Sequence, residues 1–225
     1  VIGSNGAGKS PLFNAIAGSF YVDAGAITVG GHNMTFLPVY KRAKRIGRLF
    51  QDPLKGTAPN MTIEENLALA AGNGGWVSRL TQKDRTRFRD RLALLDMGLE
   101  DRLNQPVGLL SGGQRQALTL LMAVMKKPKV LLLDEHTAAL DPKTAAKVLE
   151  LSDRFVAEGN LTTLMVTHNM KDAIAHGNRL IMMADGRIVL DVSGADRAGM
   201  TVEDLIHRFK AGTGKTLSND RMLLS

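Results

Sequence analysis

Residues 3–10 read Gly3-Ser4-Asn5-Gly6-Ala7-Gly8-Lys9-Ser10 and match the phosphate-binding pattern GxxxxGK[ST] at every fixed position. Glycines in such a loop let backbone N–H groups turn inward around phosphate oxygens, and the following helix adds its positive N-terminal end. We expect Lys9 to reach the β- and γ-phosphates and the Ser10 hydroxyl to ligate Mg²⁺. The alternative interpretation, a glycine-rich turn that matches by chance, is disfavoured because the loop lies between a predicted strand and a predicted helix, as the motif requires. The stretch predicts an α/β fold that binds a nucleotide.

The elements beside this loop fit that order. Only Val1 and Ile2 remain of the strand that should precede the loop, so we expect the chain to begin inside an element. The next helix is predicted over residues 11–17. It has Pro11 in its first turn, where a missing N–H is tolerated, and Gly18 closes it. Short strands are predicted at residues 26–29 and 46–50.

The second motif is an apolar run followed by two acidic residues. The run, Val130–Leu133, predicts a strand buried on both faces of a parallel sheet. Asp134, at the end of this strand, is suited to the Mg²⁺ shell of a phosphate-loop enzyme. Glu135 lies one residue further, where it could polarise an attacking water. Apolar strands that end in acids are common, and the preceding phosphate loop makes the functional interpretation the better one.

The stretch from Leu110 to Gln114 carries a further signal. Ser111 can cap the helix predicted over residues 112–126, with Gln114 at the capping-box position. Capping alone does not explain Gly112 and Gly113, which each weaken a helix by about 1 kcal/mol relative to alanine. We therefore expect a second anion-binding helix terminus, with another group close to its backbone.

Between these motifs the pattern is helical. Thr62 and Glu65 form a predicted capping box for a helix over residues 63–71. A loop is predicted at residues 72–75, and a second helix from Thr81 carries Phe88, Leu92 and Leu95 on one face.

After residue 129 the α/β pattern returns. Predicted elements are a helix from Asp141-Pro142 to Glu158, a strand at 163–166, a short helix capped by Asn169, and strands 180–184 and 187–192 around Asp185-Gly186. Thr201–Asp204 opens an amphipathic helix with Val202, Leu205, Ile206 and Phe209 at helical spacing. The tail after Ala211 is polar, and we expect it to be loose.

In their order these motifs resemble the ATP-binding cassette (ABC) ATPases, and the resemblance extends from Val1 to Val192. The motifs are Gly3–Ser10, Gln51, Ser111–Gln114, Asp134–Glu135 and His168. The resemblance implies a P-loop NTPase (RecA-like) α/β core with a mostly parallel sheet, an antiparallel β portion and an inserted α-helical subdomain. It implies an ATPase domain at 1–193, its helical subdomain at roughly 54–127, and a C-terminal extension at 194–225.

The resemblance also implies roles for single residues. Gln51 is similar to the Q-loop glutamine that senses metal, water and the transmembrane partner. Asp141 is similar to the D-loop aspartate, which lies with the nucleotide, and His168 to the switch histidine that contacts the γ-phosphate. Glu135 and His168 would then act with Gln51 in hydrolysis. ATP and Mg²⁺ would be the cofactors, the metal being held by Ser10, Gln51 and Asp134.

Assembly is implied in the same way. In this family the residues Ser111, Gly112, Gly113 and Gln114 of one subunit cap the ATP held by Lys9 of the other, so a homodimer is expected. Further expected partners are transmembrane permease subunits and a periplasmic or extracellular substrate-binding protein. The location would be the cytoplasmic face of the inner membrane, and the process solute import.

Three features depart from the family pattern. Pro11 stands where a threonine is usual and would cost a few tenths to about 1.5 kcal/mol of α-phosphate binding. His136 replaces a frequent proline after Glu135. The aromatic residue that stacks on adenine would precede Val1. The stretches Leu109–Gln114 and Asp134–Asp141 are similar to a little-studied importer-type branch.

Composition excludes some functions and leaves others open. The 225 residues hold no cysteine, which excludes disulfides, thiolate metal sites and cysteine nucleophiles. No apolar run reaches the roughly 18 residues that span a bilayer. We therefore expect any membrane role to depend on docking to another subunit.

The net charge of +7 comes partly from basic residues at 41–48 and 79–91. A solvated face is the favoured interpretation, with attraction to anionic lipid or nucleic acid as alternatives. We expect no specific nucleic-acid binding. Two other functions stay open: a soluble ABC ATPase that acts on nucleic acid or ribosomes, and a weakly hydrolysing, nucleotide-gated structural subunit.

Overall fold

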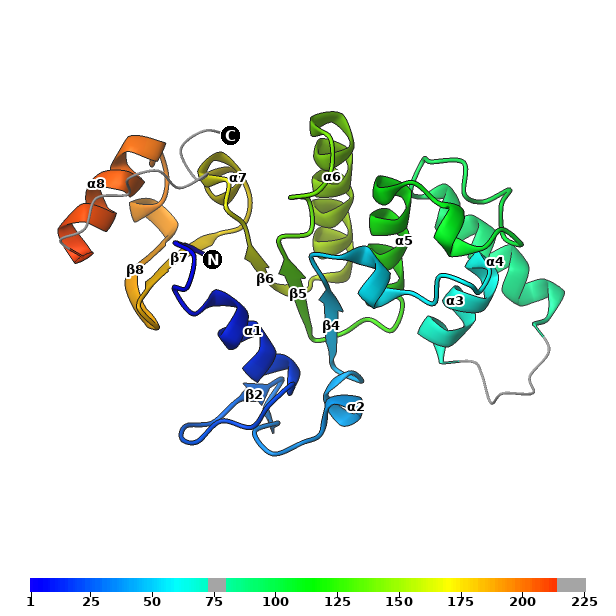
Figure 1. Ribbon diagram of the computed structural model, residues 1–225, viewed down its shortest axis with the longest axis horizontal. Coiled ribbons are helices and arrows are strands. Elements are labelled where there is room, and N and C mark those ends of the chain that lie inside the picture. The colour runs from blue at the N-terminus through cyan, green and yellow to red at the C-terminus, as the bar shows by residue number, and fades with distance from the viewer. Residues whose placement is uncertain (73–79, 214–225) are drawn as a thin grey trace. The chain divides into compact units, whose positions relative to one another are not determined.

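The computed structural model describes residues 1–72 and 80–213 (Figure 1). The chain divides into two compact units. The first comprises Val1–Gly25 and the chain from Leu164 on, and the second comprises Ala26–Thr163. Strand β6 (Thr162–Val166) crosses the boundary between them.

The first unit is built around a three-stranded sheet in the order β1-β7-β8. Strand β1 (Ile2–Gly3) pairs in parallel with β7 (Arg179–Ala184), which forms an antiparallel hairpin with β8 (Arg187–Ser193). Asp185 and Gly186 form the hairpin turn with φ angles of 48° and 75°, as their sequence predicted. The helices of this unit are α1 (Lys9–Ala17), α7 (Met170–Ala175), α8 (Val202–Thr213) and the 3₁₀ turn Gly194–Asp196.

Helix α8 belongs to the core of the first unit. Leu205 and Phe209 are buried together with Ile2, Leu180 and Met182 of the sheet. These are two of the four apolar residues that the helical spacing placed on one face. The face packs on the sheet, so α8 completes the hydrophobic core.

The second unit contains a two-stranded antiparallel pair, β2 (Thr28–Val29) and β3 (His32–Asn33), and a parallel pair, β4 (Ile46–Leu49) and β5 (Val130–Asp134). Its helices are α2 (Val39–Arg42), α3 (Ile63–Ala71), α4 (Gln82–Ala93), α5 (Gly112–Val124) and α6 (Pro142–Gly159), with 3₁₀ turns at Pro53–Gly56 and Val107–Leu109. Helix α5 packs on α6. The apolar residues Leu131, Leu132 and Leu133 of β5 are buried, as the sequence predicted for a central strand.

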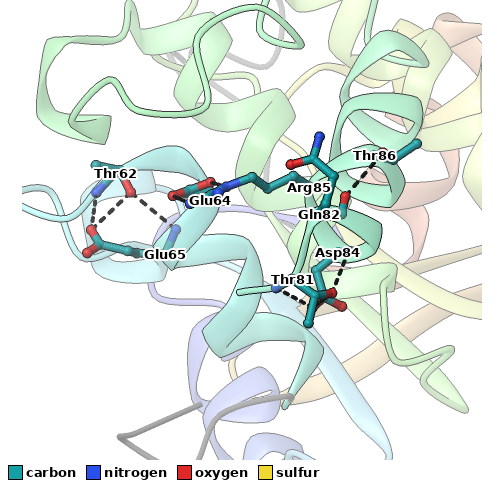
Figure 2. Close-up of polar contacts among 8 residues, drawn as sticks. All are labelled: Thr62, Glu64, Glu65, Thr81, Gln82, Asp84, Arg85 and Thr86. Atoms are coloured by element: carbon teal, nitrogen blue, oxygen red, sulfur yellow. Dashed lines mark hydrogen bonds and ion pairs between the residues drawn. The ribbon is translucent and has the colours of Figure 1, made fainter. Parts of the chain in front are cut away.

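Helices α3 and α4 begin with the same device (Figure 2). The Thr62 hydroxyl accepts the N–H of Glu65, whose carboxylate accepts the Thr62 N–H at 2.7 Å, so the predicted capping box is confirmed. Thr81 and Asp84 repeat it at the start of α4, and hydrogen bonds from Thr81 lower the pKa of Asp84. Phe88 and Leu92 of α4 are buried on the predicted face.

An ion pair joins these two helices (Figure 2). Arg85 Nε lies 2.8 Å from Glu64 Oε2, and its Nη2 lies 3.2 Å from Oε1. The bidentate geometry satisfies both oxygens of a glutamate that is only 8% exposed. These two hydrogen bonds hold the Arg85 side of α4 against α3.

The interpretation of the basic residues at 41–48 as a solvated face is wrong for Arg42, which is fully buried. Its guanidinium donates to the carbonyl oxygens of Leu37 and Thr35, each at 2.8 Å. The five donors of an arginine can satisfy several backbone carbonyls at once, which makes such burial tolerable. Lys41 and Lys44 are exposed, as predicted.

Some predictions fall outside the described residues. These are most of the loop at 72–75, the basic residue Arg79, and the tail from residue 214 on. Within residues 1–72 and 80–213, no helix has both the length and the apolar character needed to cross a membrane.

Candidate functional site

The phosphate loop lies in the first unit, between β1 and α1. Gly3 is opposite Met183 of β7, and a Cβ atom at Gly3 would lie 2.3 Å from the Met183 carbonyl oxygen. Gly8 has a φ of 101° and is the N-cap residue of α1. The loop therefore needs these glycines for two reasons: close contact with β7 at one end and a left-handed turn at the other.

The loop is held from within and from the β7–β8 turn. The Ala7 N–H donates to the Ser4 carbonyl at 3.1 Å, and the Gly186 N–H donates to the Ala7 carbonyl at 3.0 Å. Ala7 is buried, while Asn5 and Gly6 are exposed. The loop backbone is thus fixed in place while its tip faces solvent.

Lys9 is only 5% exposed, and its ammonium group donates to the carbonyl oxygens of Gly3 and Ser4. A charge this deeply buried must be paired or hydrogen-bonded. The loop carbonyls meet that need and hold the ammonium against the loop. Ser10, the predicted metal ligand, is exposed on the first turn of α1.

Pro11 is the third residue of α1 and costs the helix no hydrogen bond. The first intrahelical bond runs from the Leu12 N–H to the Gly8 carbonyl at 3.0 Å. The N–H that proline lacks is one of the donors that a helix start leaves open for an anion. The placement predicted from the sequence is confirmed.

His168 also belongs to the first unit and lies two residues after the end of β6 (Thr162–Val166). Asn169, the next residue, donates its N–H to the Thr167 hydroxyl at 3.0 Å and accepts the N–H groups of Lys171 and Asp172. His168 is half-buried. Turn bonds on both sides therefore hold its backbone at the end of a strand, as predicted.

The acidic residues and Gln51 lie together in the second unit. Strands β4 and β5 run in parallel with Leu49 opposite Leu133, so the segments after both strands meet at one edge. The Gln51 amide donates to Glu135 Oε2 at 3.2 Å. The structure thus brings together two residues that are 84 positions apart in the sequence, both predicted to act in hydrolysis.

Arg48 is a member of this cluster that the sequence did not reveal. Its Nη2 lies 3.3 Å from Asp134 Oδ2, and its guanidinium carbon lies 4.7 Å from the centre of the Phe50 ring. The Arg48 and Asp134 side chains are 15% and 14% exposed. The solvated-face interpretation is therefore also wrong for Arg48. Since it faces Leu132, two residues before Asp134, only the strand register could have revealed the pair.

We expect the Arg48→Gln substitution to lower the free energy of unfolding by about 2 kcal/mol, because it leaves a mostly buried carboxylate without its cation. Urea denaturation without nucleotide or metal measures this. Lys44→Gln is the matched control, since Lys44 is an exposed cation of the same segment. Equal stability of the two variants would mean that the ion pair contributes nothing.

The predicted capping box at Ser111 is confirmed. The Ser111 hydroxyl accepts the Gln114 N–H at 3.2 Å, and Gln114 Oε1 accepts the Ser111 N–H at 3.2 Å. For Gly113, the predicted group close to the backbone is a side chain of the same chain. A Cβ atom at Gly113 would lie 2.0 Å from Thr144 Cγ2 of α6, whereas Gly112 is exposed with only ordinary contact to Leu140.

Asp141 is the N-cap residue of α6 and accepts the Thr144 N–H at 3.0 Å. Hydrogen bonds from the Thr144 side chain and backbone lower the pKa of Asp141 below its ordinary value. The carboxylate also favours the positive helix end. Thr144 therefore connects Asp141 with the backbone at Gly113.

The proposed metal ligands suit Mg²⁺ by their chemistry. Ser10, Gln51 and Asp134 offer a hydroxyl, an amide and a carboxylate oxygen, and Mg²⁺ prefers such hard donors in small number beside the substrate phosphates. Within the described residues, no group of three or more histidine, cysteine, aspartate or glutamate side chains could hold a metal by itself.

A sequence model of the ABC transporter family matches residues 1–138. This span includes the phosphate loop, Gln51, the Ser111 terminus and both acids at the end of β5. The chain belongs to the ABC transporter family. This ABC protein is 46% identical over 212 residues to the tyrosine transport ATP-binding protein of Clostridioides difficile (strain R20291), an alignment that covers 93% of the chain and 84% of the relative.

Other relatives are similar over most of their length. The thiamine import ATP-binding protein ThiQ of Salmonella choleraesuis (strain SC-B67) is 36% identical over 188 residues, which are 84% of this chain and 76% of ThiQ. The ABC protein also matches the dimeric post-hydrolysis structure of the ATP-binding cassette MJ0796 bound to ADP and Pi. That match has a TM-score of 0.72 and 27% identity, and it covers 85% and 83% of the two chains.

These comparisons confirm the predicted fold class, a P-loop α/β core with parallel strands, antiparallel strands and helices. They also confirm the predicted ATPase of the ABC type. The roles of the single residues stay predictions.

Proposed function

We propose that two copies of this chain close head to tail around two ATP molecules and thereby drive a separate permease that imports a solute. The chain itself is an ATP-binding, ATP-hydrolysing motor subunit of an ABC transporter. The dimer is supported by the exposed helix terminus at Ser111 and Gly112, which suits an anion. It is supported too by the dimeric structure of MJ0796.

In this proposal each γ-phosphoryl group contacts Lys9 and His168 of one subunit and Ser111 of the partner subunit. Charge on the transferring group would be stabilised by donors already in place, as in other phosphoryl-transfer sites. Mg²⁺, held by Ser10, Gln51 and Asp134, would neutralise charge on the β- and γ-phosphate oxygens. Glu135 would orient or deprotonate the attacking water, and its contact with Gln51 would connect that step to the permease side.

The proposed permease, the substrate-binding protein and the direction of transport rest on the relatives. One is named for tyrosine transport and another for thiamine import. We infer import and a peripheral position at the cytoplasmic face of the membrane. The relatives also favour transport over action on nucleic acid.

The observation that carries the proposal is that a single chain has two helix N-termini of a form suited to phosphate, one at Lys9 and one at Ser111. The test is the ATP-dependent mass of the Glu135→Gln variant, in which slow hydrolysis preserves ATP. Light scattering after gel filtration should show the 24.3 kDa chain doubling its mass with ATP. Adding Ser111→Arg should keep the chain monomeric while ATP still binds.

Ser19→Arg is the matched control, since Ser19 is an exposed serine outside the proposed interface. This variant should still dimerise. A chain that binds ATP and stays monomeric, or dimerises equally with Ser111→Arg, would contradict the head-to-tail arrangement.

A further inference from the structure

His136 is a buried polar side chain that the proposed mechanism leaves without a role. It follows Glu135 directly, at the end of β5, and is only 3% exposed. Its Nε2 lies 3.1 Å from the hydroxyl oxygen of Ser152, which is also 3% exposed and belongs to α6. The contact joins the segment that carries the proposed base to α6, the helix labelled in Figure 1.

The hydrogen bonds around Ser152 fix the direction of this contact. The Ser152 hydroxyl donates to the Val148 carbonyl at 2.8 Å. A serine hydroxyl has one hydrogen, so toward the imidazole it can only accept. His136 must therefore carry a hydrogen on Nε2 and donate it to Ser152. The result is a directed chain of two hydrogen bonds from the end of β5 to the backbone of α6.

The backbone at Glu135 needs such support. Its φ is 46°, in the left-handed region that residues with a Cβ atom seldom adopt. A residue persists there only where the surrounding structure holds it. On one side the Glu135 carbonyl accepts the Ala138 N–H at 3.1 Å. On the other side, His136 is the next residue along the chain, and its hydrogen bond to Ser152 anchors it to α6.

We propose that His136 is a positioning residue for ATP hydrolysis. Its hydrogen bond to Ser152 holds the Glu135 backbone in the left-handed conformation and so directs the Glu135 carboxylate to the Gln51 amide. His136 itself is too buried to touch a substrate, so it acts only through Glu135. The inference rests on the proposed role of Glu135 as the base.

The test compares four single variants and one double variant of the full chain at a temperature where circular dichroism shows each to be folded. His136→Leu and Ser152→Ala each remove the hydrogen bond. His136→Gln keeps an N–H donor at a similar reach. Thr119→Val is the matched control, because Thr119 is also a buried hydroxyl that donates to a helix carbonyl, that of Arg115, but lies on α5.

Phosphate release at varied ATP gives kcat and KM. We expect His136→Leu and Ser152→Ala to lower kcat about tenfold, since small misplacements of a catalytic group cost this much or more. KM should stay within about twofold, because the ATP-binding residues are unchanged. His136→Gln should recover most of kcat, and Thr119→Val should keep it. The His136→Leu/Ser152→Ala double variant should be no slower than the slower single variant.

Unchanged kcat in folded Ser152→Ala would overturn the inference, and so would a His136→Gln variant as slow as His136→Leu. If His136→Leu does not fold, Ser152→Ala decides alone. The wild type and Glu135→Gln in the same assay separate the two levels of proposal. A wild type without turnover, or full turnover in Glu135→Gln, would instead contradict the function or the base on which the inference rests.

Discussion

Glu135→Gln is expected to lower ATP turnover by at least about 100-fold, the usual contribution of a general base. Glutamine keeps the size of the side chain and an oxygen that can accept the Gln51 amide, which donates to Glu135 at 3.2 Å. What it removes is the negative charge and the ability to accept a proton from water. The measurement is phosphate release at saturating ATP and Mg²⁺ from the full-length protein.

Glu150→Gln is the control for this loss of charge. Glu150 is an exposed carboxylate on α6 of the same unit. The Glu150→Gln variant should hydrolyse ATP at the wild-type rate. Undiminished hydrolysis by Glu135→Gln would refute the base assignment, and another group would then have to activate the water.

Lys9→Ala is expected to weaken ATP binding by roughly 100-fold or more, since it removes the charge-assisted contact to phosphate that we predict for this side chain. The loop itself is affected as well. The Lys9 ammonium donates to the carbonyl oxygens of Gly3 and Ser4, so its removal leaves two backbone acceptors at the loop without that donor. Isothermal titration with ATP measures the affinity.

Lys171→Ala is the control, since Lys171 is an exposed lysine of the first unit. It should bind ATP as the wild type does. Wild-type affinity in Lys9→Ala would mean that the loop binds phosphate through its backbone alone. A folded Lys9→Ala variant that loses affinity but keeps its thermal midpoint would assign the effect to the phosphate contact.

The elements that the sequence predicted well are those stabilised by neighbours along the chain. The capping boxes at Thr62 and Ser111 join residues three positions apart, so the residue types alone reveal them. The Asp185-Gly186 turn and the Gly18 cap are equally local. Element ends were less accurate: the strand predicted at 26–29 covers only Thr28–Val29, and the helix predicted to residue 126 ends at Val124.

The phosphate-loop motif was likewise readable from the chain, because eight consecutive residues form it. The family followed from the order of the motifs, and the comparisons agree. The reason for Gly113 needed the fold. The sequence indicated that some group comes close to this backbone, and the structure identifies Thr144 of α6 as one such group.

By itself, then, the sequence determined the fold class, the helix caps and the order of the ATP-binding motifs, since all depend on residue types at short, fixed spacings. Only the tertiary structure decided what distant residues do to one another. Arg48 pairs with Asp134, 86 positions further along the chain, and His136 contacts Ser152 on another element. Arg42 is buried and donates to the carbonyl oxygen of Thr35. Strand register and helix packing create these contacts, and a charged residue reads the same in the sequence whether it faces water or a buried partner.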